Sequence, residues 1–393
     1  MVYLHVPFCR SFCTYCDFYS EIACRGRDAQ TLESYADALC AEISRRRDEI
    51  EGTRDLDTFY IGGGTPSVLP LSLLRKVAAQ LLSGGVPPEP PASPCSDSTM
   101  QQAERAGASW RAEPPAGQYS AFTEFTVEVN PEDIVEKGPA YVQGLREIGV
   151  NRISMGVQSL DDGILRWMNR RHDAAHAREA FRLLREAGMD NLSVDLIFGL
   201  PQLSEALLDK TIDEVLQWRA EHISAYQLSI EEGSTLGRLV REGRYAEAPQ
   251  EQCAAQYARL CARLHEAGYV HYEISNWALP GREAVHNSAY WTRHPYVGLG
   301  PGAHSFDGRT RSWNSRTLAG WTRESETLSA AEAREEDILL GLRTARGIPE
   351  AWLVPARTAP LLSDGRLVRI PDGRVRIPED HWFVSDDIIA DLI

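Results

Sequence analysis

Residues 5–16 read His5-Val6-Pro7-Phe8-Cys9-Arg10-Ser11-Phe12-Cys13-Thr14-Tyr15-Cys16. The three cysteines, Cys9, Cys13 and Cys16, follow the spacing C-x3-C-x2-C, which brings three thiolates onto one tight loop. Iron–sulfur clusters are held by cysteine thiolates, normally four for a [4Fe–4S] cluster. Three protein ligands leave one iron open to a small molecule. The loop therefore predicts a [4Fe–4S] cluster with one coordination site available to a ligand.

A structural zinc site made from the same cysteines and His5 is the first alternative, and free thiols are the second. Zinc sites usually bring two pairs of ligands separated by a dozen or more residues, and no second pair is present. Residues 2–6 alternate as a strand does, and Pro7 ends that strand. The cysteines therefore follow the C-terminal end of a strand, which in α/β barrels is the end that carries the active site.

Composition narrows the class of protein. The 393 residues are enough for one large domain and a smaller one. A formal net charge of −15 argues against nonspecific nucleic-acid binding, which needs clustered positive charge. No apolar run is long enough to span a membrane, and the opening strand leaves no room for a signal peptide. The other cysteines are scattered and do not form a disulfide framework, so we expect a cytoplasmic protein.

Strand-like and helical patterns alternate along the chain, which predicts βα units and a parallel sheet. Strands are expected at 2–6, 58–61, 125–129, 152–156, 192–197 and 222–228. Apolar residues at helical spacing predict helices around Leu32 to Ile43 and Ala180 to Ala187, the second ended by Gly188. A helix at about 249–267, another from Ala330 and short strands within 366–377 are also expected. From the residues alone the fold class is α/β with a parallel sheet.

Residues 83–120 interrupt this pattern. The segment is rich in proline, glycine and serine and has almost no aliphatic side chains. Such a segment buries too little apolar surface to offset its ordering entropy. We expect a disordered insertion at the periphery without a chemical role.

Polar residues and glycines follow several of the predicted strands. The run Gly62-Gly63-Gly64-Thr65-Pro66 comes after the second strand, and consecutive glycines expose backbone N–H groups to a ligand. A plain tight turn is the alternative. Glu128 ends the third strand, where a carboxylate needs a partner such as an ammonium group. Gln158, Arg170 and Asp195 accompany the fourth and fifth strands, with a hydrogen-bond network inside the barrel as their alternative role.

The cysteine loop resembles that of the radical S-adenosylmethionine (SAM) superfamily. In that superfamily the amine and carboxylate of SAM bind the fourth iron, and an electron from the cluster cleaves SAM to a 5′-deoxyadenosyl radical. The resemblance implies an open (β/α)6 barrel with a small C-terminal α+β domain. The runs quoted above are similar to one branch, the oxygen-independent coproporphyrinogen III oxidases and the HemW-type haem chaperones. This similarity implies that the glycine loop holds the methionine end of SAM. The residues that it implies around SAM are Tyr3, Tyr15, Gly63, Gly64, Thr65, Glu128, Gln158, Arg170 and Asp195.

Three features favour the haem chaperones within this branch. The oxidases have a fourth cysteine where this chain has Phe18, and they have a sizeable segment before the first strand. The run His286-Asn287-x-x-Tyr290-Trp291 matches a chaperone signature proposed to bind haem. Imidazole is a common haem ligand and aromatic rings stack on porphyrins. We therefore expect His286 as the haem ligand, with His271, His294 and His304 as the substitutes.

The resemblance implies a protein that binds a [4Fe–4S] cluster, SAM and haem and delivers haem to acceptor proteins, notably membrane-bound respiratory enzymes, without coproporphyrinogen III dehydrogenase activity. Radical decarboxylation of coproporphyrinogen III is the alternative, and a radical SAM reaction on another substrate is a third. Three domains are expected: the radical SAM core at 1–232 including the insertion, a barrel extension with the haem region at 233–329, and a HemN-like C-terminal domain at 330–393.

Overall fold

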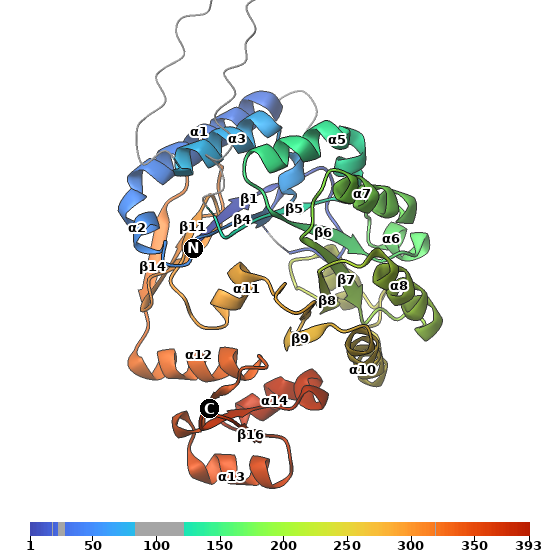
Figure 1. Ribbon diagram of the computed structural model, residues 1–393, viewed down its shortest axis with the longest axis vertical. Coiled ribbons are helices and arrows are strands. Elements are labelled where there is room, and N and C mark those ends of the chain that lie inside the picture. The colour runs from blue at the N-terminus through green and yellow to red at the C-terminus, as the bar shows by residue number, and fades with distance from the viewer. Residues whose placement is uncertain (18, 23–27, 83–121, 319) are drawn as a thin grey trace, which may run out of the picture.

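The computed structural model describes residues 1–17, 19–22, 28–82, 122–318 and 320–393. Phe18 and the expected insertion at 83–120 lie outside the described residues. The centre of the molecule is a nine-stranded sheet, curved into an open barrel, with the order β11-β1-β4-β5-β6-β7-β8-β10-β9 (Figure 1). Its six central strands are parallel and are β1 (Val2–Val6), β4 (Thr58–Gly63), β5 (Glu124–Val129), β6 (Arg152–Gln158), β7 (Leu192–Phe198) and β8 (His222–Gln227). All six strands predicted from the sequence are confirmed, with small differences at their ends.

Three further strands extend the sheet at its two edges. β11 (Val297–Leu299) pairs parallel with β1, on the side opposite β4. At the other edge, β10 (Asn276–Ala278) pairs antiparallel with β8 and also with β9 (Val270–Glu273). The prediction of a sheet with six parallel strands alone was therefore incomplete. Segments that follow the core in sequence cover both of its edges.

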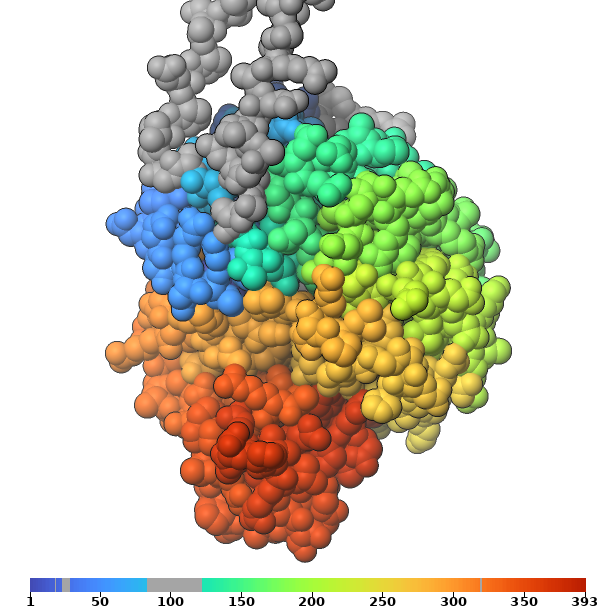
Figure 2. All heavy atoms as spheres, viewed as in Figure 1, coloured from blue at the N-terminus to red at the C-terminus, as the bar shows by residue number. Residues whose placement is uncertain are grey.

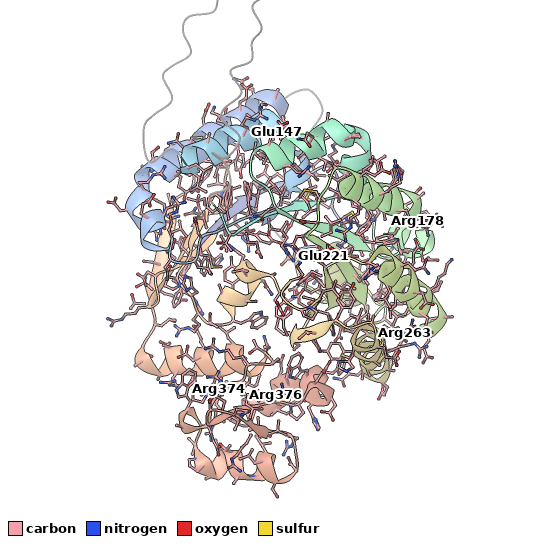
Figure 3. All side chains as sticks on the ribbon, viewed as in Figure 1. Glu147, Arg178, Glu221, Arg263, Arg374 and Arg376 are labelled. Atoms are coloured by element: carbon pink, nitrogen blue, oxygen red, sulfur yellow. The ribbon has the colours of Figure 1, made fainter. Side chains whose placement is uncertain are left out.

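Helices cover the outer face of the sheet (Figure 1). They are α1 (Asp28–Arg45), α2 (Arg47–Gly52), α3 (Leu71–Leu82), α5 (Pro131–Glu147), α6 (Asp162–Trp167), α7 (Ala174–Glu186), α8 (Glu205–Trp218) and α10 (Gln250–Glu266). The start of α9 (Thr235–Arg241) instead contacts the cysteine loop. Gly188 follows Ala187, the C-cap residue of α7, and has a φ of 79°. This left-handed conformation agrees with the predicted role of Gly188 as the glycine that ends the helix. Neighbouring helices are tied by ion pairs between the Arg178 and Glu214 side chains and between Arg263 and Asp213, whose arginines are labelled in Figure 3.

The two faces of the central strands differ in polarity. In β5, Phe125, Val127 and Val129 belong to the continuous apolar core between the sheet and the helices. The alternate residues of the same strand, such as Glu124 and Glu128, lie on the inner face of the barrel, because successive side chains of a strand point to opposite faces. The inner face is therefore polar, which is unlike the apolar interior of a packed barrel and suits a space that receives a ligand.

The C-terminal third contains two small sheets. β12 (His304–Phe306), β13 (Thr310–Asn314) and β14 (Arg323–Thr327) form one sheet, and β15 (Ile348–Pro349), β17 (Arg374–Arg376) and β16 (Val368–Ile370) form the other. The helices of this part are α12 (Ala330–Leu342), α13 (Pro355–Ser363) and α14 (Ser385–Ala390), and the last residues project at one end of the molecule (Figure 2). The expected helix from Ala330 and the strands within 366–377 are confirmed. Ile338 and Ile388 belong to the same apolar core as the barrel, and the division into three domains stays a prediction.

Candidate functional site

The cysteine loop and the glycine loop are in direct contact. Cys9 lies in the short strand β2 (Phe8–Cys9), which pairs with β3 (Glu21–Ile22). The backbone N–H of Gly64 donates to the carbonyl of Val6 at 2.7 Å, and that of Thr65 donates to the carbonyl of Phe8 at 2.7 Å. A Cβ at position 64 would lie 2.8 Å from the Phe8 carbonyl oxygen and 3.1 Å from the Cys9 sulfur. Only glycine therefore allows the two loops to approach this closely.

The second cysteine of the loop contacts residues that follow β6. Arg170 donates from Nη1 to the sulfur of Cys13 at 3.4 Å and from Nη2 to the carbonyl of Gly156 at 2.8 Å. The Tyr15 hydroxyl is hydrogen-bonded to both Cys13 and Arg170. A donating guanidinium stabilises negative charge on the sulfur. The structure thus brings together two residues, Tyr15 and Arg170, that the sequence analysis assigned to one site.

Backbone contacts hold the cysteine loop in place. Thr14 donates its backbone N–H to the carbonyl of Met168 at 3.1 Å, and the side-chain amide of Asn169 donates to the carbonyl of Phe12 at 2.7 Å. Asn169 itself has a φ of 56°, a left-handed conformation that asparagine tolerates better than most residues. On its other side, the carbonyl of Thr14 accepts from the backbone N–H of Leu236 at 2.7 Å. The thiols are therefore presented by a loop that is fixed at both sides.

The zinc alternative does not fit this geometry. His5 accepts or donates at both ring nitrogens, Nδ1 to the Tyr3 hydroxyl at 3.0 Å and Nε2 to the carbonyl of Tyr19 at 2.9 Å, so it has no nitrogen left for a metal. Ligands of one tetrahedral zinc lie about 3.8 Å apart, given Zn–S bonds of about 2.3 Å. In the described ranges the only three potential ligands whose donor atoms all lie within 4.8 Å of one another are Cys261, His271 and Glu379.

The wider spacing of the three cysteine sulfurs suits a cluster of several irons better than one ion. Burial raises the pKa of the Cys9 thiol, and the hydrogen bond with Thr65 lowers it by less. The positive charge of bound iron is therefore needed to stabilise the Cys9 thiolate. Arg170 supplies such charge from the protein side at Cys13. Cys9, Cys13 and Cys16 are therefore the residues that fit a [4Fe–4S] cluster, which when bound would supply electrons and one open iron.

Glu128 lies on the inner face next to the glycine loop. One carboxylate oxygen accepts from the Tyr60 hydroxyl at 2.7 Å, and the other accepts from the backbone N–H of Gly63 at 3.2 Å. Burial raises the pKa of Glu128 to about 7, and the nearby Asp195 carboxylate adds to this effect. A carboxyl group with this pKa is partly protonated near neutral pH, and it loses its proton when a cation binds beside it. A Cβ on Gly63, whose φ is 110°, would lie 2.6 Å from the His5 ring.

Two other predicted site residues lie further around the barrel. Gln158 ends β6 after a register shift and has a φ of 66°, which is a strained conformation for a residue other than glycine. Its side-chain amide is directed at Gly156, where a Cβ would lie 3.0 Å away. Asp195 accepts from the Ser154 hydroxyl at 3.0 Å and from Ser193 at 3.4 Å, and burial raises its pKa. Asp195 therefore takes part in the interior hydrogen-bond network that was its alternative role.

His286 lies at the other end of the barrel from the cysteines. It is in α11 (Val285–Tyr290) and is only 1% exposed. Its Nδ1 is 2.9 Å from the Thr58 hydroxyl, at the start of β4, and its Nε2 is 3.1 Å from the Tyr290 hydroxyl. Because a strand rises about 3.3 Å per residue, Thr58 is roughly 20 Å from Gly64. Burial lowers the pKa of His286 to about 3, so the ring is neutral.

The structure separates the other histidines by their surroundings. His271 is buried, stacks on Trp277 with ring centroids 4.0 Å apart, and is hydrogen-bonded to Glu379 at 2.7 Å. His304 is exposed and stacks with Trp313 at 6.1 Å beside a surface cavity of about 650 Å³. The signature run forms the short helix α11, in which the His286 side chain is buried. Haem coordination by His286 through one ring nitrogen requires release of the hydrogen bond that this nitrogen makes, to Thr58 or to Tyr290.

Several residues of the inner face were missed by the sequence analysis. Tyr60 binds Glu128, and Ser154 binds Asp195. Arg152, at the start of β6, is only 3% exposed. The alternation of polar residues in the predicted strands was the one signal that could have indicated them.

The fold and the site have relatives among known proteins. Residues 3–215 match the model of the Radical SAM superfamily. A protein named heme chaperone HemW from Bacillus subtilis strain 168 is 33% identical over 357 residues, which cover 88% of this chain and 84% of that protein. One of the same name from Mycobacterium tuberculosis strain H37Rv is 33% identical over 381 residues, 93% of this chain and 88% of that protein. The chain belongs to the HemW family of radical SAM proteins.

A solved structure agrees with this assignment at the level of the fold. The structure of coproporphyrinogen III oxidase (HemN) from Escherichia coli, described as a radical SAM enzyme, matches with a TM-score of 0.70 and 19% identity, over 99% of this chain and 89% of that one. Membership of the radical SAM superfamily implies a [4Fe–4S] cluster and SAM. No helix of this HemW-family chain has, within the described ranges, the length and apolar character needed to cross a membrane.

Proposed function

We propose that the protein is a haem chaperone that binds haem and delivers it to acceptor proteins. The observation that carries the proposal is the 33% identity to proteins named heme chaperone HemW, sustained over most of both chains. The proposed acceptors are haem-containing respiratory proteins, including membrane-bound ones. The proposed compartment is the cytoplasm, whose reducing conditions suit a cysteine-held cluster.

The proposed cofactor site is at the cysteine end of the barrel. Cys9, Cys13 and Cys16 would hold the cluster. Glu128 would bind the amino group of SAM, with the glycine loop beside its methionine end. Gln158, Arg170 and Asp195, together with the aromatic rings of Tyr3 and Tyr15, complete the set proposed to surround SAM. Support comes from the contacts of Arg170 with Cys13 and of Glu128 with Gly63.

The proposed haem ligand is His286, with His304 as the competing candidate. His286 belongs to the signature run, but both of its ring nitrogens are hydrogen-bonded. His304 is exposed, and its neighbours Arg311 and Arg316 carry positive charge that suits haem propionates. Haem titration of His286→Ala and His304→Ala, each against the parent, distinguishes them. The variant that loses the iron-ligand signature of the bound haem identifies the axial ligand.

An anaerobic assay of the reconstituted protein tests the function directly. One reaction offers coproporphyrinogen III, SAM and a reductant and follows protoporphyrinogen formation. The other offers haem and follows its binding spectrum and its transfer to an apo-acceptor. We expect haem binding and transfer without porphyrinogen turnover. Turnover would instead favour the alternative function, radical decarboxylation of coproporphyrinogen III.

A further inference from the structure

A buried arginine on the inner face of the barrel has a guanidinium nitrogen without a partner. Arg152 is 3% exposed, and the buried Nε of its guanidinium has no hydrogen-bond partner among the described residues. The positive charge of Arg152 acts to lower the pKa values of Glu128 and Asp195, but these carboxylates accept their hydrogen bonds from other donors. An arginine is charged at any physiological pH, and an unpaired buried charge is strongly unfavourable. The position therefore calls for an anion.

Arg152 lines a cavity of about 200 Å³ inside the barrel. Other walls of this cavity are the side chains of Tyr3, Tyr60 and Ser154 from the central strands and of His286 and Asn287 from α11. Most of these polar groups already have partners, such as His5 for Tyr3 and Glu128 for Tyr60. The guanidinium is thus the group in the cavity that lacks a hydrogen-bond acceptor.

The cavity can be reached from the interior of the barrel. Tyr226, which also lines it, is 45% exposed although it lies on the inner face of β8. Surrounding protein nevertheless raises the pKa of this phenol through burial, with Asp195 as a further contribution. Tyr226 is thus accessible to solvent and also surrounded by protein, so it faces an enclosed, solvent-accessible space. A ligand group entering the barrel can therefore reach Arg152.

We propose that this cavity binds a carboxylate group, held by the Arg152 guanidinium, and that the carboxylate is a propionate of haem. A guanidinium binds carboxylate through two parallel hydrogen bonds. A dianion such as phosphate is disfavoured because Glu128 and Asp195 lie nearby. At about 200 Å³ the cavity is smaller than sites for whole drug-sized ligands, and its size suits a propionate side chain. The identity of the ligand rests on the proposed haem function, whereas the carboxylate site does not.

The first experiment compares haem with its dimethyl ester, which lacks both carboxylates. Each is titrated into the reconstituted full chain, the Arg152→Gln and Arg152→Lys variants, and the control Arg182→Gln, whose exposed arginine pairs with Glu179 within α7. We expect the parent and the control to bind haem about tenfold more tightly than the ester. Arg152→Gln should lose this preference, and Arg152→Lys should keep part of it. Equal affinity of the parent for haem and ester would overturn the proposed propionate.

The second experiment separates the carboxylate site from the haem function and needs no variant to fold. Thermal unfolding of the apoprotein is followed with increasing sodium propionate or with propionamide, which has the same shape without the charge. We expect propionate alone to raise the unfolding temperature in a saturable way. If haem does not bind but propionate stabilises, the proposed function fails and the carboxylate site stands. If propionate and propionamide act alike, the carboxylate site is wrong.

Discussion

The sulfur of Cys9 lies 3.4 Å from the hydroxyl of Thr65, so the first cysteine of the cluster loop touches the end of the glycine loop on the neighbouring strand. The two loops are more than fifty residues apart in sequence, and the parallel pairing of β1 with β4 brings them together. The same contact would bring the proposed cluster next to the loop proposed to hold the methionine end of SAM.

Replacing Cys13 by serine should remove the cluster without unfolding the protein. The hydroxyl is a poor iron ligand, whereas the loop is held by backbone contacts of Thr14 that the substitution leaves intact. Iron and sulfide content and the charge-transfer absorbance of the reconstituted protein should fall to background, with unchanged far-UV circular dichroism. Cys40→Ser, in α1, is the control and should keep a full cluster. A cluster retained in Cys13→Ser would overturn the ligand assignment.

Gly64→Ala should destabilise the apoprotein by about 1–3 kcal/mol and lower its cluster content. The added Cβ would meet the carbonyl oxygens of Phe8 and Val6, at 2.8 and 3.0 Å, and these backbone atoms have little room to move. Urea unfolding measures the first effect and iron analysis the second. Gly52→Ala is the matched control, since nothing lies within 4 Å of its Cβ position. Equal effects of the two substitutions would contradict the close packing of the loops.

SAM binding should release a proton below neutral pH. The pKa of Glu128 is raised to about 7, so at pH 6.5 much of this carboxyl is protonated in the free protein. Pairing with the ammonium of SAM favours the carboxylate and lowers that pKa, so the affinity should rise as the pH rises toward 7. Calorimetry in two buffers of different ionisation enthalpy counts the proton. In Glu128→Gln the proton release should disappear, and its persistence would assign it to another group.

His286→Ala should lower the free energy of unfolding of the haem-free protein by about 1–3 kcal/mol. The substitution leaves the hydroxyls of Thr58 and Tyr290 without their partner inside the protein. His304→Ala removes an exposed ring and should change stability by less than about 0.5 kcal/mol. Urea unfolding of both variants checks this. Equal stability of His286→Ala and the parent would show that the buried hydrogen bonds contribute little, and would favour a ring free to bind haem.

The central strands could be predicted from sequence because each is at least five residues long and its alternate side chains, which face the helices, are apolar. The edge strands β10 and β11 have three residues each, too few to show an alternation. The cysteine and glycine loops were recognisable because their residues are consecutive in sequence. The hydrogen bonds of His286 and the lack of a hydrogen-bond partner for Arg152 depend on residues that are distant in sequence. A local sequence pattern cannot predict such contacts.

The pairing of β1 with β11 has a consequence for biosynthesis. β1 is translated long before β11, so the edge of β1 that pairs with β11 has no hydrogen-bonding partner until residues 297–299 have been made. An unpaired strand edge invites association with other chains. The cysteine loop follows β1 directly and is also translated long before β11, so its supporting strand is fully paired only late in translation. We expect cluster insertion to be largely post-translational, and chains truncated before β11 to aggregate instead of accepting iron.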